Sequence, residues 1–322
     1  MPADSAAAPL VSLAAAAVTA CAACAGAYLA RGSTAVPAAW WACGAAVAAG
    51  AEAAARAAGG LADPASQTSA RLAVSALALC PIMSLLGAKR PQHGVWQFIV
   101  ATLAAVLALP AATATLVRPG SLPDVHPLQR WFMLVVAIVA GLNFVATRHG
   151  LAAVAIVAAQ ATLMRTVLPF GSGGSSPIVD AIAAAVVAGG AVAAVVQSAV
   201  WPAGRSKPGA AEVSGAVAAD VQAALGPAYL ALRETLGAAW ALRIAERFNA
   251  EAASAGWPCR LSFDGLHVDG DPGDRHWQAD AIRTGRALLR RFVSTEWIGR
   301  HGAKGEKAGK RGVQVASHPG GG

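Results

Sequence analysis

The chain has 322 residues, of which 56% are hydrophobic and only 13% charged, and its mean hydropathy is +0.52. Ordinary soluble domains are about a quarter charged, so this composition excludes a protein that is water-soluble throughout. The net charge of +8 arises from nine basic and five acidic residues up to Trp201, and from sixteen basic and twelve acidic residues after it. Neither part is basic enough to indicate nucleic-acid binding, and no nucleic-acid partner is expected.

Seven apolar segments in the first two hundred residues are candidates for membrane-spanning helices, because about 20 apolar residues cross the hydrocarbon core. Short turn-rich sequences separate them. The third, fourth and fifth contain Leu, Ile, Phe or Trp, whereas the first two are mostly alanine and insert less favourably. The predicted spans are residues 8–30, 36–55, 72–88, 95–117, 131–146, 151–170 and 178–201.

The orientation of these spans follows from the basic residues between them. The loops on the two sides carry equal numbers of Lys and Arg. The cytoplasmic loops would hold Arg31, Lys89, Arg90 and Arg148, and the outer loops Arg56, Arg71, Arg118 and Arg130. The basic sequence after the last span, beginning with Arg205 and Lys207, breaks the tie. Basic residues concentrate on the cytoplasmic side, so we expect the N-terminus outside and the C-terminus in the cytoplasm. The N-terminal segment lacks the basic start of a secretory signal and is expected to be a retained helix.

Residues 203–300 have the composition of a small soluble α+β domain. A long helix is expected from near Ala210, with Leu232, Leu236, Trp240, Ile244 and Phe248 on one face. Asp264-Gly265 indicates a hairpin with a type I′ turn, and a second amphipathic helix is expected over 276–298. The glycine-rich basic segment 301–322 is predicted to be disordered.

Polar side chains within the predicted spans are the first place to look for function, because burying them in hydrocarbon is costly. Asp180 and Glu52 lie near span boundaries, with Arg56 one turn from Glu52, and Arg165 is expected to extend its guanidinium to the membrane surface. The amides are expected to form interhelical hydrogen bonds. These candidate intramembrane amides are Gln97, Asn143, Gln160 and Gln197.

The last predicted helix offers a second candidate surface. Arg283, Arg286 and Arg290 are spaced so that they form one stripe, opposite the apolar Ile282, Leu289 and Phe292. This stripe is either a solvated face or a contact for anionic lipid headgroups. No catalytic, cofactor or metal motif is recognisable in the sequence, so neither an enzyme nor a cofactor protein is expected.

Several short sequences carry a resemblance to other proteins. These are residues 86–92 with 96–98, residues 107–110, and residues 243–249 with Trp257-Pro258. They resemble a group of bacterial multi-pass membrane proteins with no assigned activity. The resemblance implies a shared membrane architecture, and no functional residue is carried over from it.

The sequence therefore predicts a mainly α-helical protein of a bacterial inner (plasma) membrane, with seven spans and a cytoplasmic helix-hairpin-helix domain. The expected role is that of a scaffold or accessory subunit with membrane-protein partners. A small-molecule or ion transporter is the alternative, which would require a polar, water-accessible path lined by residues such as Asn143, Gln160 and Gln197.

Overall fold

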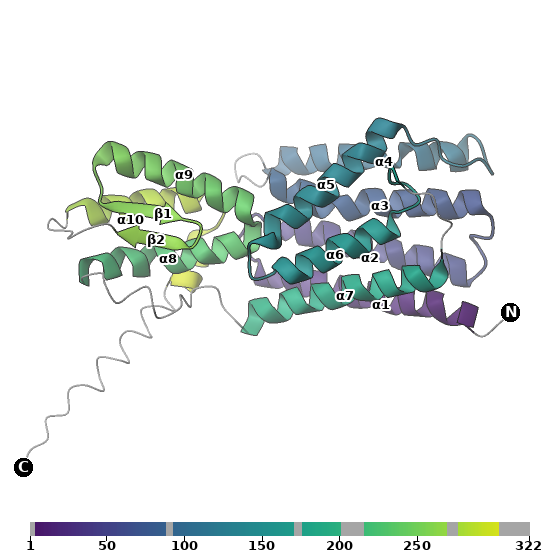
Figure 1. The fold of residues 1–322 in the computed structure, drawn as a ribbon, viewed down its shortest axis with the longest axis horizontal. Helices are drawn as coiled ribbons and strands as arrows, with labels where there is room; N and C mark the ends of the chain where they lie inside the picture. The colour runs from purple at the N-terminus through teal and green to yellow at the C-terminus, as the bar shows by residue number, and fades with distance from the viewer. Residues whose placement is uncertain (1–3, 88–92, 171–175, 201–215, 269–275, 303–322) are drawn as a thin grey trace, which may run out of the picture. The chain divides into compact units, whose positions relative to one another are not determined.

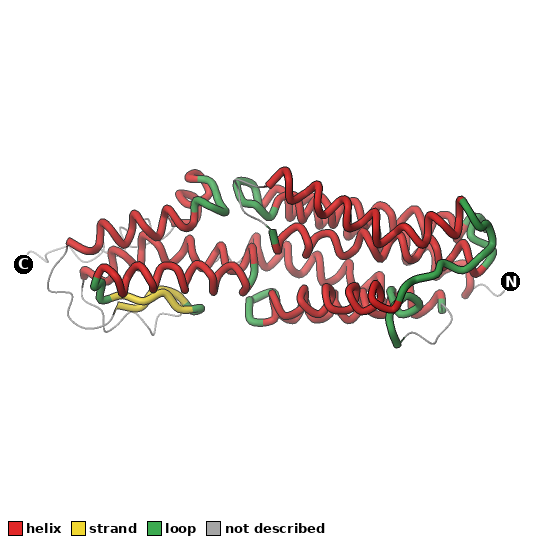
Figure 2. Tube along the Cα trace, turned by 90° about the horizontal axis from the view of Figure 1, so that it is seen from above, coloured by secondary structure: helices red, strands yellow, loops and turns green. Residues whose placement is uncertain are grey.

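The computed structural model describes residues 4–87, 93–170, 176–200, 216–268 and 276–302 (Figure 1). The chain divides into two compact units, Met1–Ala199 and Val200–Gly322. The described part is mainly helical with one small sheet, as Figure 2 shows. The disorder predicted for 301–322 concerns a segment that lies outside the described residues except for 301 and 302.

Unit 1 contains a helix at each of the seven predicted positions. These are α1 (Asp4–Leu29), α2 (Val36–Ala57), α3 (Pro64–Leu86), α4 (His93–Leu116), α5 (Pro127–Val145), α6 (Gly150–Leu163) and α7 (Pro177–Val200). Five of them are long and apolar enough to cross a membrane, namely α1, α3, α4, α5 and α7. Their outward surfaces expose large apolar side chains such as Phe98, Leu116 and Leu142. Such extended apolar exposure is typical of a surface that contacts lipid.

The other two helices differ from the five for separate reasons. Helix α2 has 22 residues but is rich in alanine and carries Glu52 and Arg56. Helix α6 has 14 residues instead of the 20 predicted, which at 1.5 Å per residue gives about 21 Å, less than the roughly 30 Å hydrocarbon core. Seven crossings therefore remain a prediction.

The third helix begins earlier than the sequence indicated. Pro64 occupies its first turn, and the Asp63 carboxylate accepts a 2.8 Å hydrogen bond from the Ser66 backbone N–H. Hydrogen bonds from the Ser66 side chain and from its backbone N–H lower the pKa of Asp63, because they stabilise the charged carboxylate. The N-cap places Arg71 two turns inside the helix, whereas the predicted span started after it.

Neighbouring helices of unit 1 run antiparallel, as the contacts at their opposite ends show. In the first half of α1, Leu13 and Ala16 lie against Gly50 in the second half of α2. Trp96 at the start of α4 donates a 2.8 Å hydrogen bond to the Met83 carbonyl near the end of α3.

Helices α6 and α7 approach closely at Gly190. A Cβ at this position would lie 2.7 Å from the Ile156 side chain and 3.4 Å from the Ala152 carbonyl oxygen. A larger residue here would force the Ile156 side chain to shift, so the absence of a side chain permits this local approach of the two helices.

Unit 2 contains α8 (Ala216–Leu236), α9 (Ala238–Ala255), a hairpin of β1 (Cys259–Ser262) and β2 (Gly265–Val268), and α10 (His276–Leu289). The single long helix that the sequence predicted is divided at Gly237, whose φ of 85° lies outside the helical range. The five apolar residues of the predicted stripe are all buried, but they belong to two helices. The last predicted helix ends at Leu289, and a separate helical segment follows at 295–302.

The hairpin forms where predicted but with a different turn. Ser262 pairs with Gly265, so Phe263 and Asp264 are the two loop residues, and neither has a positive φ. A type I′ turn needs positive φ at both central residues, so that prediction was wrong. The Ser262 hydroxyl instead accepts a hydrogen bond from the Asp264 backbone N–H at 3.2 Å.

Side chains of α8 and α9 hold the hairpin. Asn249 pairs with β1 like a strand residue, donating to the Leu261 carbonyl at 2.9 Å and accepting from the Leu261 N–H at 2.7 Å. Arg233 donates to the Phe263 carbonyl at 2.8 Å and contacts the buried Glu234 carboxylate, with its Nη2 2.5 Å from Oε1. A two-stranded hairpin alone is marginally stable, so these contacts fix its position in the unit.

Tyr229 gives unit 2 a measurable alkaline transition. Its hydroxyl donates to the Ala241 carbonyl at 3.2 Å, and burial raises its pKa to about 12. The pKa of an unfolded tyrosine is about 10, so the folded state keeps the proton up to a higher pH than the unfolded state does. The stabilisation is complete below about pH 10 and is lost as the pH rises toward 12. We expect tyrosinate absorbance of a Tyr28→Phe variant to titrate near pH 12, and a midpoint near 10 would contradict the burial.

Candidate functional site

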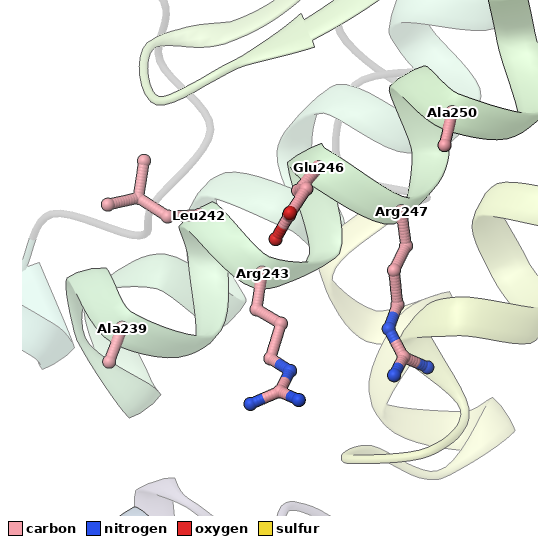
Figure 3. A pocket seen from close by; sticks show the side chains of 6 residues that line it. All are labelled: Ala239, Leu242, Arg243, Glu246, Arg247 and Ala250. Atoms are coloured by element: carbon pink, nitrogen blue, oxygen red, sulfur yellow. The ribbon is translucent and has the colours of Figure 1, made fainter.

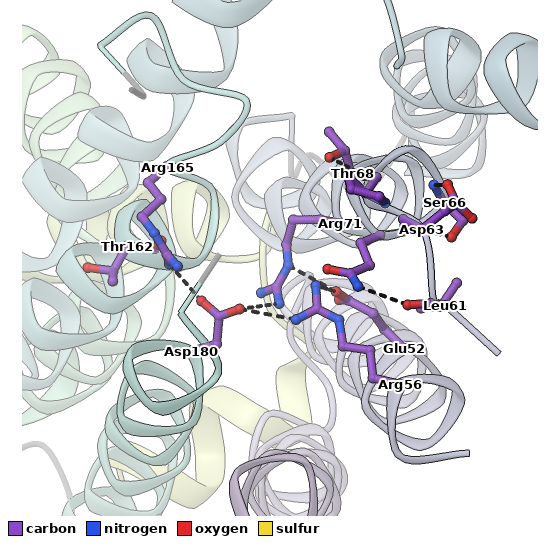
Figure 4. A network of polar contacts seen from close by, with 12 residues as sticks. Glu52, Arg56, Leu61, Asp63, Ser66, Thr68, Arg71, Thr162, Arg165 and Asp180 are labelled. Carbon is purple, nitrogen blue, oxygen red and sulfur yellow. Dashed lines mark hydrogen bonds and ion pairs between the residues drawn. The ribbon is translucent and has the colours of Figure 1, made fainter. Parts of the chain in front are cut away.

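The described residues of unit 1 contain a cluster of five charged side chains, which we call the charge cluster: Glu52, Arg56, Arg71, Arg165 and Asp180. Figure 4 shows them converging from α2, α3, the turn after α6, and α7. The side chains are between 5% and 22% exposed. Charges at this depth are costly unless they are paired.

Local structure brings each member to the cluster. Glu52 and Arg56 are one turn apart on α2, and their Oε1 and Nη2 atoms lie 2.7 Å apart. Asp180 is in the first turn of α7, where the helix dipole favours a carboxylate. Arg165 follows the end of α6 and donates a 2.8 Å hydrogen bond to the Thr162 carbonyl, as a basic residue at a helix C-terminus commonly does.

The Asp180 carboxylate is the centre of the cluster. Its Oδ1 lies 2.6 Å from Arg165 Nη1, and its Oδ2 lies 2.9 Å from Arg71 Nη2 and 3.2 Å from Arg56 Nη1. Glu52 provides the second carboxylate, with Oε1 3.0 Å from Arg71 Nε. One carboxylate therefore connects α7 to three other parts of the bundle.

The cluster borders a cavity of about 300 Å³. It lies where α2, α4 and α6 end and α3, α5 and α7 begin. Four arginines line it (Arg56, Arg71, Arg130 and Arg165), together with the Asp180 carboxylate and the polar Gln67, Thr68 and Thr166. Such an arrangement is suited to holding an anion by charge-assisted hydrogen bonds.

A larger hollow of about 630 Å³ lies on the exposed face of α9. Figure 3 shows that Arg243, Glu246 and Arg247 line it along a single helix, with Leu242 beside them. Side chains from one helix alone do not converge on a common point, so this surface is a weaker candidate for a binding site.

Among the residues that the structure describes, no group of three or more His, Cys, Asp or Glu side chains is placed to hold a metal ion. No protein-family model, curated protein or solved structure matches the chain.

The predicted intramembrane amides do not gather at one place. Each lies within about one turn of a helix end: Gln97 in α4, Asn143 in α5, Gln160 in α6 and Gln197 in α7. Gln97 Oε1 accepts from Trp41 Nε1 at 2.8 Å and from the Ser84 hydroxyl at 3.1 Å. Gln197 Oε1 is 3.0 Å from His149 Nδ1. Asn143 is buried and Gln160 is half-buried.

Two of the clustered charges, Arg71 and Arg165, lie in other surroundings than the sequence predicts. Arg71 was counted with an outer loop because the third span was expected to begin after it. Arg165 was expected to reach the membrane surface, but its guanidinium turns to Asp180. The i,i+4 spacing of Glu52 and Arg56 was the available sequence signal, and it did not indicate the partners on other helices.

The predicted basic stripe on α10 lies at the surface of unit 2. Arg283, Arg286 and Arg290 are all exposed, with Arg290 just beyond the end of the helix. Arg283 Nη2 is 2.6 Å from Asp280 Oδ1, and both side chains are more than half exposed. An exposed pair of this kind contributes little to stability, so the stripe remains accessible to a partner.

The cluster predicts that Asp180→Asn is strongly destabilising. This change leaves Arg56, Arg71 and Arg165 with a single carboxylate, and breaking a buried ion pair typically costs about 3–5 kcal/mol. Thermal unfolding of the purified protein in detergent should show a clear fall in midpoint.

The matched control for this change is Asp124→Asn. Asp124 is exposed at the same end of the bundle and should unfold like the unsubstituted protein. Equal midpoints for the two variants would show that the buried ion pairs contribute no net stability.

Proposed function

We propose that the chain is an integral membrane scaffold or accessory subunit. The observation that carries this proposal is the placement of the four amides near helix ends instead of along one path across the bundle. Between the ends, the bundle interior is packed with apolar residues such as Ala76, Ala104 and Ala137, each at most 5% exposed. A dry interior suits a protein that holds partners more than one that conducts solutes.

Seven crossings are part of this proposal. Helix α2 runs antiparallel to α1, and α6 runs antiparallel to α7, with the His149–Gln197 contact at one end and the Arg165–Asp180 pair at the other. In the proposed arrangement, α2 and α6 each return the chain across the membrane between two apolar spans. The short α6 is compatible with a crossing because protein surrounds its polar C-terminal turn, where irregular backbone is tolerated.

The proposed orientation has the N-terminus outside and the 203–300 domain in the cytoplasm of a bacterial cell, at the inner (plasma) membrane. The basic residues that follow the last span, beginning with Arg205 and Lys207, support it, because basic residues concentrate on the cytoplasmic side.

A transporter is the second candidate, because the cavity beside the charge cluster is polar. It opens at one end of the bundle, whereas transport needs a binding site near the midplane that alternates between the two sides. The scaffold is therefore the better supported of the two.

Cysteine accessibility distinguishes the two functions. In a background without the native cysteines, Ala76→Cys and Ala137→Cys place thiols at buried positions within α3 and α5. A charged, water-soluble thiol reagent should leave both unmodified, because no water path reaches them. Modification of either would favour the transporter.

The exposed Arg118→Cys and Asp264→Cys variants are the controls and also report orientation. The first is at the same end of unit 1 as the cavity, and the second is in the hairpin turn, 87% exposed. In intact cells the impermeant reagent should modify Arg118→Cys alone, and Asp264→Cys only after the membrane is opened. The opposite pattern would reverse the proposed topology.

We also propose that the basic stripe of α10 contacts anionic lipid headgroups. Each arginine near such a surface contributes about 1 kcal/mol, so three contribute roughly 3 kcal/mol. Residues 209–300 as a separate fragment should sediment with anionic liposomes and not with neutral ones. Arg283→Gln, Arg286→Gln and Arg290→Gln together should abolish this.

The matched control changes the same amount of charge elsewhere in unit 2, through Arg243→Gln, Arg247→Gln and Arg260→Gln. These three arginines are exposed on α9 and β1, and their substitution should leave most of the sedimentation intact. An equal loss in both triple variants would mean that net charge, and not the stripe, determines the interaction.

A further inference from the structure

The cavity beside the charge cluster carries more positive than negative charge. Its lining includes four guanidinium groups and one carboxylate, that of Asp180. Glu52 does not line the cavity itself, but its carboxylate is paired with Arg71 and is the second negative charge at the site. Four arginines against two carboxylates leave two positive charges at a site largely removed from water.

Arg130 accounts for one of these charges. Its Nε donates a 3.1 Å hydrogen bond to the Val125 carbonyl, and within the described residues it has no carboxylate partner. The side chain is half-buried at the start of α5. An arginine in this position gains most from an anion that is not part of the chain, because its charge is otherwise only partly compensated.

The other lining arginines also retain unused hydrogen-bonding capacity. Within the described residues, Arg165 Nη2, Arg56 Nε and the Thr166 hydroxyl are buried and have no hydrogen-bond partner. The ion pairs with Asp180 and Glu52 use only some of the donors that the guanidinium groups offer. An oxyanion with several acceptor oxygens could satisfy donors that the two carboxylates leave over.

We propose that this cavity binds a phosphate group, either free in solution or as part of an anionic phospholipid headgroup. Planar arginine forks match the oxygens of a phosphate and hold it by paired hydrogen bonds. The cavity lies at the helix ends, which is the depth at which lipid phosphates meet a membrane protein. Its volume of about 300 Å³ accommodates such a group. The site is a property of one end of the bundle and does not depend on the scaffold role.

Arg130→Gln is the sharpest test, because Arg130 forms none of the described ion pairs and its loss should leave the fold intact. The purified full-length protein in uncharged detergent is unfolded thermally in sodium phosphate and in sodium chloride of equal ionic strength. Phosphate should raise the midpoint of the unsubstituted protein, and the apparent affinity should fall roughly tenfold or more in Arg130→Gln, as expected for the loss of a charge-assisted hydrogen bond. Arg118→Gln, which removes an exposed charge at the same end, should behave like the unsubstituted protein.

Native mass spectrometry then identifies the source of the phosphate. Phosphatidylglycerol retained by the unsubstituted protein and by Arg118→Gln, but lost from Arg130→Gln, would assign the site to a lipid headgroup. Stabilisation by inorganic phosphate without retained lipid would assign it to a free solute. The proposal is overturned if there is neither stabilisation nor retention, or if Arg130→Gln and Arg118→Gln respond alike.

Discussion

The Asp180 carboxylate is the interaction on which the arrangement of the helical bundle most depends. It contacts guanidinium groups from α2, from α3 and from the turn after α6, all at 3.2 Å or less. A carboxylate that is only 6% exposed would be unfavourable in its charged form without such partners. The same ion pairs attach α7 to the rest of the bundle. The position of α7 therefore depends on the pairing of the Asp180 charge.

Polar groups in unit 1 are concentrated at the two ends of the bundle. The charge cluster and Gln160 lie at one end, while Gln97, Asn143 and Gln197 lie at the other, with mainly apolar side chains packed between them. Small residues allow close helix contacts at some points, such as Gly50 of α2 against Ala16 of α1. The cavity beside the charge cluster therefore lies at one end of the bundle, among the polar side chains gathered there.

Unit 2 is organised around an apolar core of its own, which includes Tyr229, Phe248 and Trp297. The break at Gly237 folds α9 back so that residues from both helices share one core. Arg233 joins this core to the hairpin through the Phe263 carbonyl. With the hairpin fixed, α10 packs by its apolar side and leaves its arginines exposed, which is the geometry that a membrane-surface contact would need.

The sequence by itself determined the class of the protein and the approximate positions of its helices, because apolar length and turn residues are local properties. It also located the hairpin and the basic stripe. It could not show that α2, α3, α6 and α7 bring Glu52, Arg56, Arg71, Arg165 and Asp180 together, since these residues are up to 128 positions apart. The four-residue spacing of the apolar residues from Leu232 to Phe248 also could not show that Gly237 divides this segment into two helices. Both features depend on which helix faces pack together, and only the tertiary structure decides that.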